Sequence, residues 1–332
     1  MNVLFVGGTG NISRACVKRA LEEGWEVLLL NRGTRSDLVP EGVRLIQSDI
    51  RNLEQTKKSL DGLSFDVVAQ FVGYVPEHIQ TDFEILRDRV GQYIFISSAS
   101  VYHKPSLNHI ITESTPLHNP FWQYARSKIA CESLLREMYA EKGFPMTVVR
   151  PSHTYNDGWI PTTFTSSNYT IAQRMLAGKE IISHGDGQSL WTLTHASDFA
   201  KGFVGLFGNA QAIGEAFHIT SDEALSWDQI YRTIGLQLGV EPRLVHIPSD
   251  IIAKIEPDLA GGLLGDKAYS SLFDNSKIKR LVPSFRISIS FNTGMRRSLE
   301  WYERHPELKR SDPKTESLIE RILAEWHRMV GN

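Results

Sequence analysis

The stretch Asn2-Val3-Leu4-Phe5-Val6-Gly7-Gly8-Thr9-Gly10-Asn11-Ile12-Ser13 decides the fold that we expect for this chain. Its apolar first half predicts a buried parallel strand, and the residues after the glycines predict a helix that ends near Gly24. Glycines permit a tight turn and a close approach of the backbone to a pyrophosphate, which the helix N-terminus attracts through its unpaired N–H groups. A glycine-rich loop between a first strand and a first helix therefore predicts a dinucleotide site, formed by Gly7, Thr9, Gly10, Asn11 and Ile12.

Short apolar segments alternate with helical segments over the first 150 residues. Further strands are expected at residues 26–30, 43–48, 66–73 (with the following loop), 92–97 and 146–149. This alternation predicts an α/β fold built on a Rossmann-like doubly wound parallel sheet.

The pattern changes after Pro151, where prolines, aromatic residues and hydroxyl residues predict loops over the carboxyl edge of the sheet. We expect an NAD(P)-binding Rossmann domain at residues 1–155. A smaller C-terminal substrate-binding lobe is expected at residues 156–332, interleaved with returning Rossmann elements. The last helix has an apolar stripe that predicts core packing, formed by Leu318, Ile319, Ile322, Leu323, Trp326, Met329 and Val330.

The composition narrows the class of protein and its partners. The chain has 332 residues, 41% of them apolar, and a formal net charge of −2, which argues against nucleic acid or an anionic membrane as a partner. No stretch approaches the roughly 18 apolar residues of a membrane span. Cys16 and Cys131 have no paired spacing, so a reducing, cytoplasmic location is expected. The scattered histidines predict no metal site, and His103 and His109 are expected in a proline-containing loop.

The loop after the second expected strand bears on the choice between NAD and NADP. An NAD-selective site places Asp or Glu there, about 20 residues after the glycines, to bind the adenosine 2′-hydroxyl. This chain has Asn31 and Arg32 instead, with Arg35 close behind. Arginine pairs well with a 2′-phosphate, so we expect NADP as the cofactor, with NAD still open. Gly73 is expected to let the backbone lie near the cofactor.

A second stretch, centred on Tyr124 and Lys128, carries the candidate chemistry. Asn119 and Pro120 predict the N-cap and the first position of a helix over residues 119–141. The two side chains then lie four residues apart on one helix face. A phenol has a pKa of about 10, so it exchanges a proton near neutral pH only when a fixed cation stabilises the phenolate. Lys128 can supply that cation, and Ser98, at the end of an apolar run, can hold a substrate oxygen against the phenol.

These residues lie in segments that resemble a known family. The strand end Ser97-Ser98-Ala99-Ser100-Val101-Tyr102 and the pattern Tyr124-x-x-Ser127-Lys128-x-x-x-Glu132 resemble the extended short-chain dehydrogenase/reductases, also called the NAD-dependent epimerase/dehydratase family. The resemblance covers nearly the whole chain, since further segments follow in the family's order: Arg150-Pro151, Gly185-Asp186-Gly187, Ala196-Ser197-Asp198-Phe199-Ala200 and Phe273-Asp274-Asn275-Ser276-Lys277.

The resemblance implies an oxidoreductase or epimerase that transfers a hydride at a hydroxyl carbon of a sugar-like substrate. It implies Ser98, Tyr124 and Lys128 as catalytic residues, with Lys128 also holding the nicotinamide ribose. The other residues that it implies are Asp49, Ile50 and Pro151 for the cofactor, and Ser100, Tyr102, His153 and Trp191 for the substrate.

Two alternatives stay open. One is an NADP-dependent carbonyl reductase of a non-sugar substrate. The other is an RNA-binding protein of the chloroplast stem-loop-binding type, because that branch shares openings like Asn31-Arg32-Gly33. A homodimer is also an allowed assembly.

Three departures from the family pattern carry further expectations. Ser13 replaces a usual third glycine, so a slightly altered phosphate loop is expected. Ala99 and Ser100 stand where the family's 4,6-dehydratases have an acidic pair, so we expect no 4,6-dehydration.

The third departure concerns the substrate phosphates. His153 stands where nucleotide-sugar enzymes of the family commonly have Asn, and Trp191 stands near their usual Arg. No Arg or Lys lies between Gly187 and Ala200. A buried diphosphate without a cation is costly, so a substrate without a nucleotide diphosphate is expected, unless Arg174, Lys267 or Arg280 supplies the charge.

Overall fold

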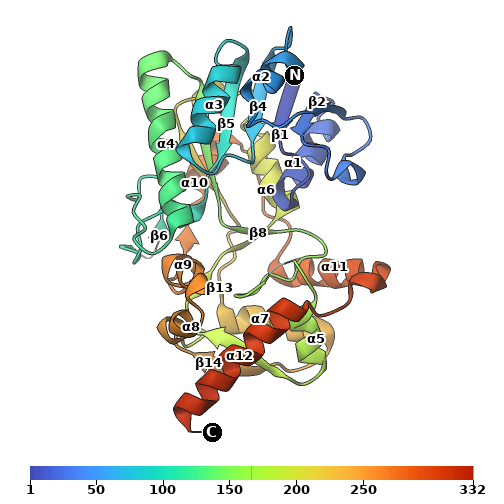
Figure 1. Ribbon diagram of the computed structural model, residues 1–332, viewed down its shortest axis with the longest axis vertical. Coiled ribbons are helices and arrows are strands. Elements are labelled where there is room, and N and C mark those ends of the chain that lie inside the picture. The colour runs from blue at the N-terminus through green and yellow to red at the C-terminus, as the bar shows by residue number, and fades with distance from the viewer. Residues whose placement is uncertain (109, 166, 332) are drawn as a thin grey trace.

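The computed structural model describes residues 1–108, 110–165 and 167–331, so His109 lies outside the described residues. Its centre is a seven-stranded parallel sheet in the upper part of Figure 1. In spatial order the strands are β12 (Ala216–Ile219), β7 (Met146–Pro151), β5 (Val90–Ile96), β4 (Phe65–Gln70), β1 (Asn2–Val6), β2 (Glu26–Asn31) and β3 (Arg44–Gln47).

The order of the strands fixes where a ligand can bind. The chain runs from β1 outward through β2 to β3 and then returns to the other side of β1 with β4. Parallel sheets bind ligands beyond the carboxyl ends of the strands, at the point where the order reverses. The loops after β1, β4, β5 and β7 all leave this edge, because every strand of the sheet is parallel. The predicted doubly wound parallel sheet is confirmed.

Helices cover both faces of the sheet. The side chains of β1 alternate between these two faces. Val3 and Phe5 pack in a core with helix residues such as Phe199, whereas Leu4 and Val6 pack in a second core with residues such as Leu135. The helices of this lobe are α1 (Asn11–Glu22), α2 (Leu53–Ser59), α3 (Pro76–Leu86), α4 (Gln123–Lys142), α6 (Ala196–Val204) and α10 (Ser276–Leu281).

A lower lobe with its own core contains the other helices, and the chain ends there (Figure 1). Its helices are α5 (Thr170–Leu176), α7 (Trp227–Leu238), α8 (Ser249–Ile255), α9 (Ala260–Gly262), α11 (Phe291–Arg304) and α12 (Pro313–Val330). The remaining strands form two-stranded pairs: β10 (Leu190–Trp191) with β13 (Leu225–Ser226), β11 (Leu193–His195) with β8 (His153–Tyr155), β14 (Arg243–Ile247) with β9 (Glu180–His184), and β15 (Leu272–Phe273) with β6 (Ile110–Ile111).

The lobes interleave, since α6 and β12 follow lower-lobe elements in the chain and return to the central sheet. A division at residue 155 stays a prediction. Among the described residues, no helix has both the length and the hydropathy that crossing a membrane requires.

Two local expectations are wrong. Helix α4 begins at Gln123 with Trp122 as its N-cap, whereas Asn119 lies before it and binds the turn through its side-chain oxygen, which accepts from the N–H groups of Phe121 and Trp122. In α12 the stripe packs through Ile319, Ile322 and Leu323, but Met329 and Val330 in the last turn are exposed.

Candidate active site

The glycine loop after β1 has the backbone that a phosphate cradle needs. Gly7 and Gly8 have φ values of 107° and 91°, and a Cβ atom on Gly8 would lie 2.4 Å from Cδ2 of Leu29. Ser13 is buried, and its hydroxyl accepts a 2.9 Å hydrogen bond from the N–H of Gly10. The serine thus packs where a third glycine was expected and takes one N–H group of the loop. A cavity of about 500 Å³ opens over the loop, so these residues fit a pyrophosphate.

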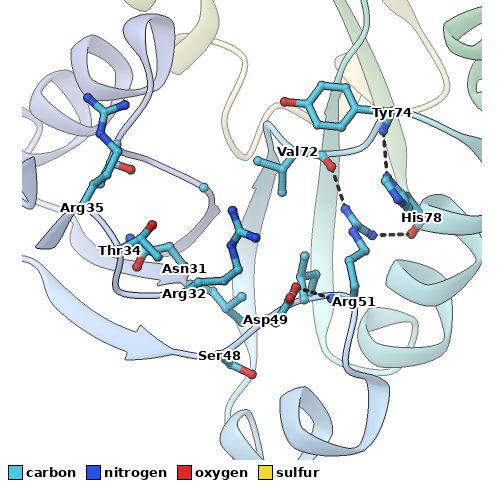
Figure 2. A pocket seen from close by; sticks show the side chains of 14 residues that line it. Asn31, Arg32, Thr34, Arg35, Ser48, Asp49, Arg51, Val72, Tyr74 and His78 are labelled. Atoms are coloured by element: carbon cyan, nitrogen blue, oxygen red, sulfur yellow. Dashed lines mark hydrogen bonds between the residues drawn. The ribbon is translucent and has the colours of Figure 1, made fainter.

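A second cavity, of about 400 Å³, lies beyond the ends of β2 and β3 (Figure 2). Asn31, Arg32, Asp49 and Ile50, the residues expected to bind the adenosine end of the cofactor, line it together with Arg35. The side-chain oxygen of Asn31 accepts a 2.8 Å hydrogen bond from the N–H of Gly33 and so shapes the loop. Its amide nitrogen is buried and has no hydrogen-bond partner among the described residues.

The arginines of this second cavity differ in what they already bind. Arg51 donates to the main-chain oxygens of Val72, at 2.7 Å, and His78, at 3.2 Å, and pairs with Asp82. Figure 2 shows Arg32 extending into the middle of the cavity. Within the described part of the chain, the guanidinium groups of Arg32 and Arg35 make no hydrogen bond or ion pair. Two cations are therefore free to bind an anion there.

Lys128 is fixed between the end of β5 and the loop after β4. Its Nζ donates to the carbonyl oxygens of Gly73, at 2.6 Å, and Ile96, at 2.7 Å. An ammonium group has three donors, so one remains for a ligand or a phenol. Gly73 holds the lysine in this way and does not line the cavities described here.

The surroundings of Lys128 are aromatic. Its Nζ lies 4.6 Å from the ring centre of Phe95, 5.0 Å from that of Tyr74 and 5.8 Å from that of Tyr124. Burial lowers the pKa of Lys128 to about 8, against the opposing charges of Cys131 and Glu132. The ring faces stabilise the buried cation in part, and at neutral pH the lysine is charged beside the phenol.

Tyr124 is in its protonated form at neutral pH. Burial, with a smaller contribution from Tyr74, raises the pKa of its phenol to about 12, although a hydrogen bond with the Ser98 side chain acts in the opposite direction. Ser98 also lies 2.9 Å, Oγ to Oγ, from Ser100. The phenol and two hydroxyls thus form one hydrogen-bonding group.

This group lies where two cavities meet. Ser98, Tyr124, Pro151 and Ser152 line both the cavity over the glycine loop and a third cavity of about 260 Å³. Lys128 lines only the first of these two. A substrate in the third cavity would therefore face a ligand on the glycine loop across Tyr124 and Ser98.

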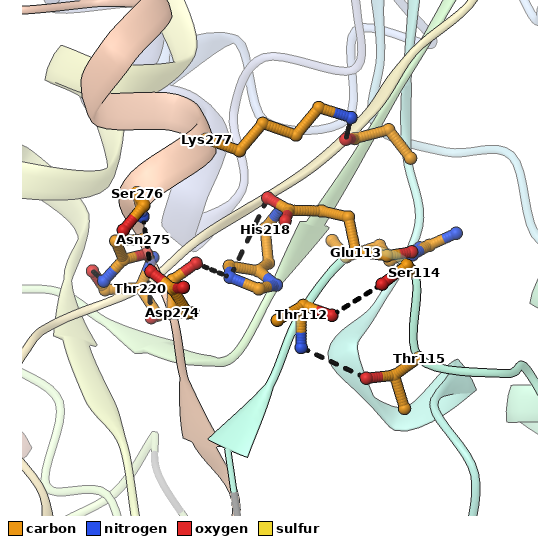
Figure 3. Close-up of polar contacts among 12 residues, drawn as sticks. Thr112, Glu113, Ser114, Thr115, His218, Thr220, Asp274, Asn275, Ser276 and Lys277 are labelled. Atoms are coloured by element: carbon orange, nitrogen blue, oxygen red, sulfur yellow. Dashed lines mark hydrogen bonds and ion pairs between the residues drawn. The ribbon is translucent and has the colours of Figure 1, made fainter.

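Three of the four predicted substrate residues line the 260 Å³ cavity: Ser100, His153 and Trp191. Tyr102 does not. It is fully buried, with its hydroxyl 3.0 Å from Nδ1 of His218 and the guanidinium carbon of Arg150 at 4.9 Å from its ring centre. Nε2 of the same histidine forms a hydrogen bond with the main-chain oxygen of Asp274, beside Glu113 (Figure 3). The prediction for Tyr102 is wrong because its side chain points into this polar core.

Sequence reasoning missed part of the cavity wall. Lower-lobe residues such as Asp266, Lys267, Ser271 and Phe273 line the cavity. Of these, the sequence singles out Lys267 as one source of charge and Phe273 as part of a family segment, but predicts neither as a wall of the cavity. A cation thus does reach this cavity. Arg174 instead pairs with Glu316 and Glu320.

Asp266, Lys267 and Ser271 lie between the elements that the sequence patterns predict, so no local pattern placed them at the cavity. Arg280, the other cation considered, is exposed at the end of α10. Within the described ranges, no three His, Cys, Asp or Glu side chains come together to hold a metal ion.

Comparison with known proteins agrees with this geometry. The model of the NAD dependent epimerase/dehydratase family matches residues 3–220. The chain is 26% identical over 291 residues to the 2'-dehydrokanamycin reductase of Streptomyces kanamyceticus, an alignment that covers 86% of this chain and 80% of that protein.

Two further similarities fall on other branches. The chain is 27% identical over 258 residues to the chloroplast stem-loop binding protein of 41 kDa b of Arabidopsis thaliana, covering 74% of this chain and 65% of that protein. The solved dTDP-glucose 4,6-dehydratase of Bacillus anthracis, in complex with NAD, superposes with a TM-score of 0.74 at 18% identity, over 92% of this chain and 98% of that one.

Proposed function

Because the chain belongs to the NAD-dependent epimerase/dehydratase family, we propose that it is an NADP-dependent oxidoreductase that reduces a carbonyl, or oxidises the matching hydroxyl, on a sugar-like substrate. One observation carries the proposal: Ser98 and Tyr124 line both the cavity over the glycine loop and the adjoining 260 Å³ cavity, with Lys128 beside them. The relative named as a reductase supports the direction of the reaction.

Each of the three residues has a separate role in the proposed reaction. Tyr124 donates its phenolic proton to the substrate oxygen, and the hydroxyl of Ser98 holds that oxygen in place. The positive charge of Lys128 stabilises the phenolate that remains. When bound, the nicotinamide group supplies the hydride. A protonated phenol at neutral pH suits the reductive direction.

The cofactor residues fit a dinucleotide with a 2′-phosphate. The pyrophosphate would lie on the loop formed by Gly7, Thr9, Gly10, Asn11 and Ile12, which line the first cavity. The adenosine end would lie against Asp49 and Ile50. Arg32 and Arg35 have free guanidinium groups there, which favours NADP over NAD.

We expect Arg32→Ala to remove the preference for NADPH over NADH. The wild type should bind NADPH more tightly in a fluorescence titration, and losing a charge-assisted contact to phosphate should cost roughly 1.5–3 kcal/mol in NADPH binding. NADH binding should change little. Arg44→Ala is the matched control, because Arg44 is exposed at the start of β3, whereas the cavity lies beyond the end of that strand. Equal affinity of the wild type for both cofactors would contradict this assignment.

The pKa of Lys128 predicts how activity depends on pH. Below a pH of about 8 the ammonium is charged, and above it the amine is neutral. A neutral amine no longer stabilises the phenolate, so kcat/KM with saturating NADPH should fall as the pH rises through about 8. Lys128→Arg keeps its charge over this range, so any activity that it retains should stay flat. A wild-type profile that rises between pH 7 and 10 would speak against this role.

The experiment that tests the function follows NADPH absorbance during incubation with a panel of keto-sugars, keto-cyclitols and sugar nucleotides. A reductase consumes NADPH in proportion to product, whereas an epimerase changes the stereochemistry of its substrate without net consumption. We expect consumption, and no 4-keto-6-deoxy product from nucleotide sugars, because Ala99 and Ser100 occupy the positions of the acidic pair. Net epimerisation, or that dehydrated product, would overturn the proposal.

A further inference from the structure

The lower-lobe wall of the 260 Å³ cavity is charged, whereas the wall formed by Ser98 and Tyr124 is not. Asp266 and Lys267 both line the cavity, at the end of the π-helical turn Leu263–Lys267. Ser271 follows four residues later in the same wall. The function proposed above gives these residues no role.

Lys267 is held in place through its backbone. Its carbonyl oxygen lies 3.0 Å from Nε2 of His184 and accepts a 3.2 Å hydrogen bond from the hydroxyl of Ser189. Two residues earlier, the carbonyl oxygen of Gly265 accepts a 2.6 Å bond from the side chain of Asn119, just before helix α4. The segment is thus fixed to both walls of the cavity, and a ligand group placed by Lys267 would have a defined position relative to Tyr124.

The amine of Lys267 is available to a ligand. Among the described residues, its Nζ makes no hydrogen bond and no ion pair within 4.0 Å. Asp266 interacts with it electrostatically but also faces Lys104. One carboxylate therefore serves two lysines.

Lys104 adds a second charge behind the wall. It is 1% exposed, and its Nζ donates to the hydroxyl of Ser271 at 2.9 Å. Because that hydroxyl accepts from an ammonium, its own proton is free to be donated into the cavity. Trp191 is 4% exposed and lines the same cavity with its ring, whereas its ring N–H is buried away from the cavity. The polar groups of this wall are thus mainly donors.

The lower-lobe wall has one more basic side chain than acidic side chains. Lys104 and Lys267 are two basic groups beside one acidic group, Asp266, and although burial lowers the pKa of each lysine and raises that of Asp266, the attraction between them opposes these shifts. His153, which also lines the cavity, is neutral near pH 7, because burial lowers its pKa to about 3. A surplus of one cation, with neutral donors around it, suits one anionic group. A diphosphate, with more negative charge, would remain undercompensated.

We propose that Lys267, assisted by Ser271, binds a single anionic substituent of the substrate, a carboxylate or a phosphate monoester, at the lower-lobe wall of the cavity. This inference rests on the proposed function for the position of the reacting carbon at Tyr124. It narrows the substrate to an acidic or singly phosphorylated sugar-like molecule. Of these two anions, the carboxylate matches the single surplus basic group of the cavity wall better, because it carries one negative charge.

Isothermal titration of the NADP-saturated protein tests the site without requiring turnover. The probes are glucuronate, glucose 6-phosphate and inorganic phosphate, with glucose as the neutral control. We expect at least one anionic probe to bind about ten-fold or more tightly than glucose, and Lys267→Met to abolish that difference. Tighter binding of glucuronate than of glucose 6-phosphate would identify a carboxylate, and the reverse order a phosphate monoester.

Two further variants separate a specific site from general effects. Lys254→Met removes the same charge from an exposed position on α8 and should leave the titrations unchanged. Lys267→Arg keeps the charge and should retain the preference for anions, which covers the case in which the methionine variant folds poorly. Anionic probes that bind no more tightly than glucose, or that bind Lys267→Met as well as the wild type, would overturn the inference. Failure of Tyr124 variants to lose activity would instead count against the proposed function, because these titrations do not depend on catalysis.

Discussion

Replacing Tyr124 with phenylalanine is expected to lower kcat of the reduction by about 10²- to 10⁴-fold, the usual contribution of a general acid. The change removes one oxygen atom and keeps the ring, so the packing against Trp122, whose ring centre lies 4.9 Å away, should persist. Tyr124 is the phenol at the junction of the two cavities. In the wild type, a pKa of about 12 keeps this phenol protonated over the working range. The phenylalanine variant lacks that proton donor at every pH tested.

The measurement combines steady-state kinetics with a titration of NADPH. Binding of the cofactor should change little, because the glycine loop and Arg32 remain intact. Tyr139→Phe is the matched control, since Tyr139 lies on the same helix but is 41% exposed. A Tyr124→Phe enzyme with wild-type kcat would remove the phenol from the mechanism, and an equal loss in Tyr139→Phe would show that the helix, rather than the phenol, was affected.

Much of the upper lobe could be predicted because its signals are local. The apolar run of β1 and the glycines after it determine strand, turn and helix within a dozen residues, and Tyr124 and Lys128 share a helix face through their spacing alone. The family resemblance added the order of the later segments. Local patterns of this kind survive folding because tertiary contacts reinforce them.

The lower-lobe wall could not be predicted in the same way. Lys267 reaches the cavity because the carbonyls of Lys267 and Gly265 are held by residues distant in the chain, among them Asn119. Tyr102 follows the predicted strand end, but its orientation depends on His218, 116 residues away. Spacing along the chain carries no information about such contacts.

One buried ion pair links the three elements that carry the proposed site. Glu132, on α4 one turn after Lys128, accepts from Nε of Arg150 at 2.9 Å and from its Nη2 at 2.6 Å. It also accepts a 2.6 Å hydrogen bond from the hydroxyl of Ser97. Ser97 directly precedes Ser98, and Arg150 directly precedes Pro151. The carboxylate therefore fixes the ends of β5 and β7 to helix α4.

We expect Glu132→Ala to lower the free energy of unfolding by about 3–5 kcal/mol, because it leaves the guanidinium of Arg150 buried without its partner. Urea unfolding followed by fluorescence measures this loss. The double change Glu132→Met with Arg150→Met should recover most of it, since replacing both members of a buried pair by apolar groups costs little.

Glu300→Ala breaks a helical pair with Arg296 on the surface and should change stability little. If Glu132→Ala unfolds at the same urea concentration as Glu300→Ala, the pair does not hold the site together. A large loss that the double change reverses, with kcat still low in the stable double variant, would show that Glu132 positions Ser98 and Lys128 in addition to stabilising the fold.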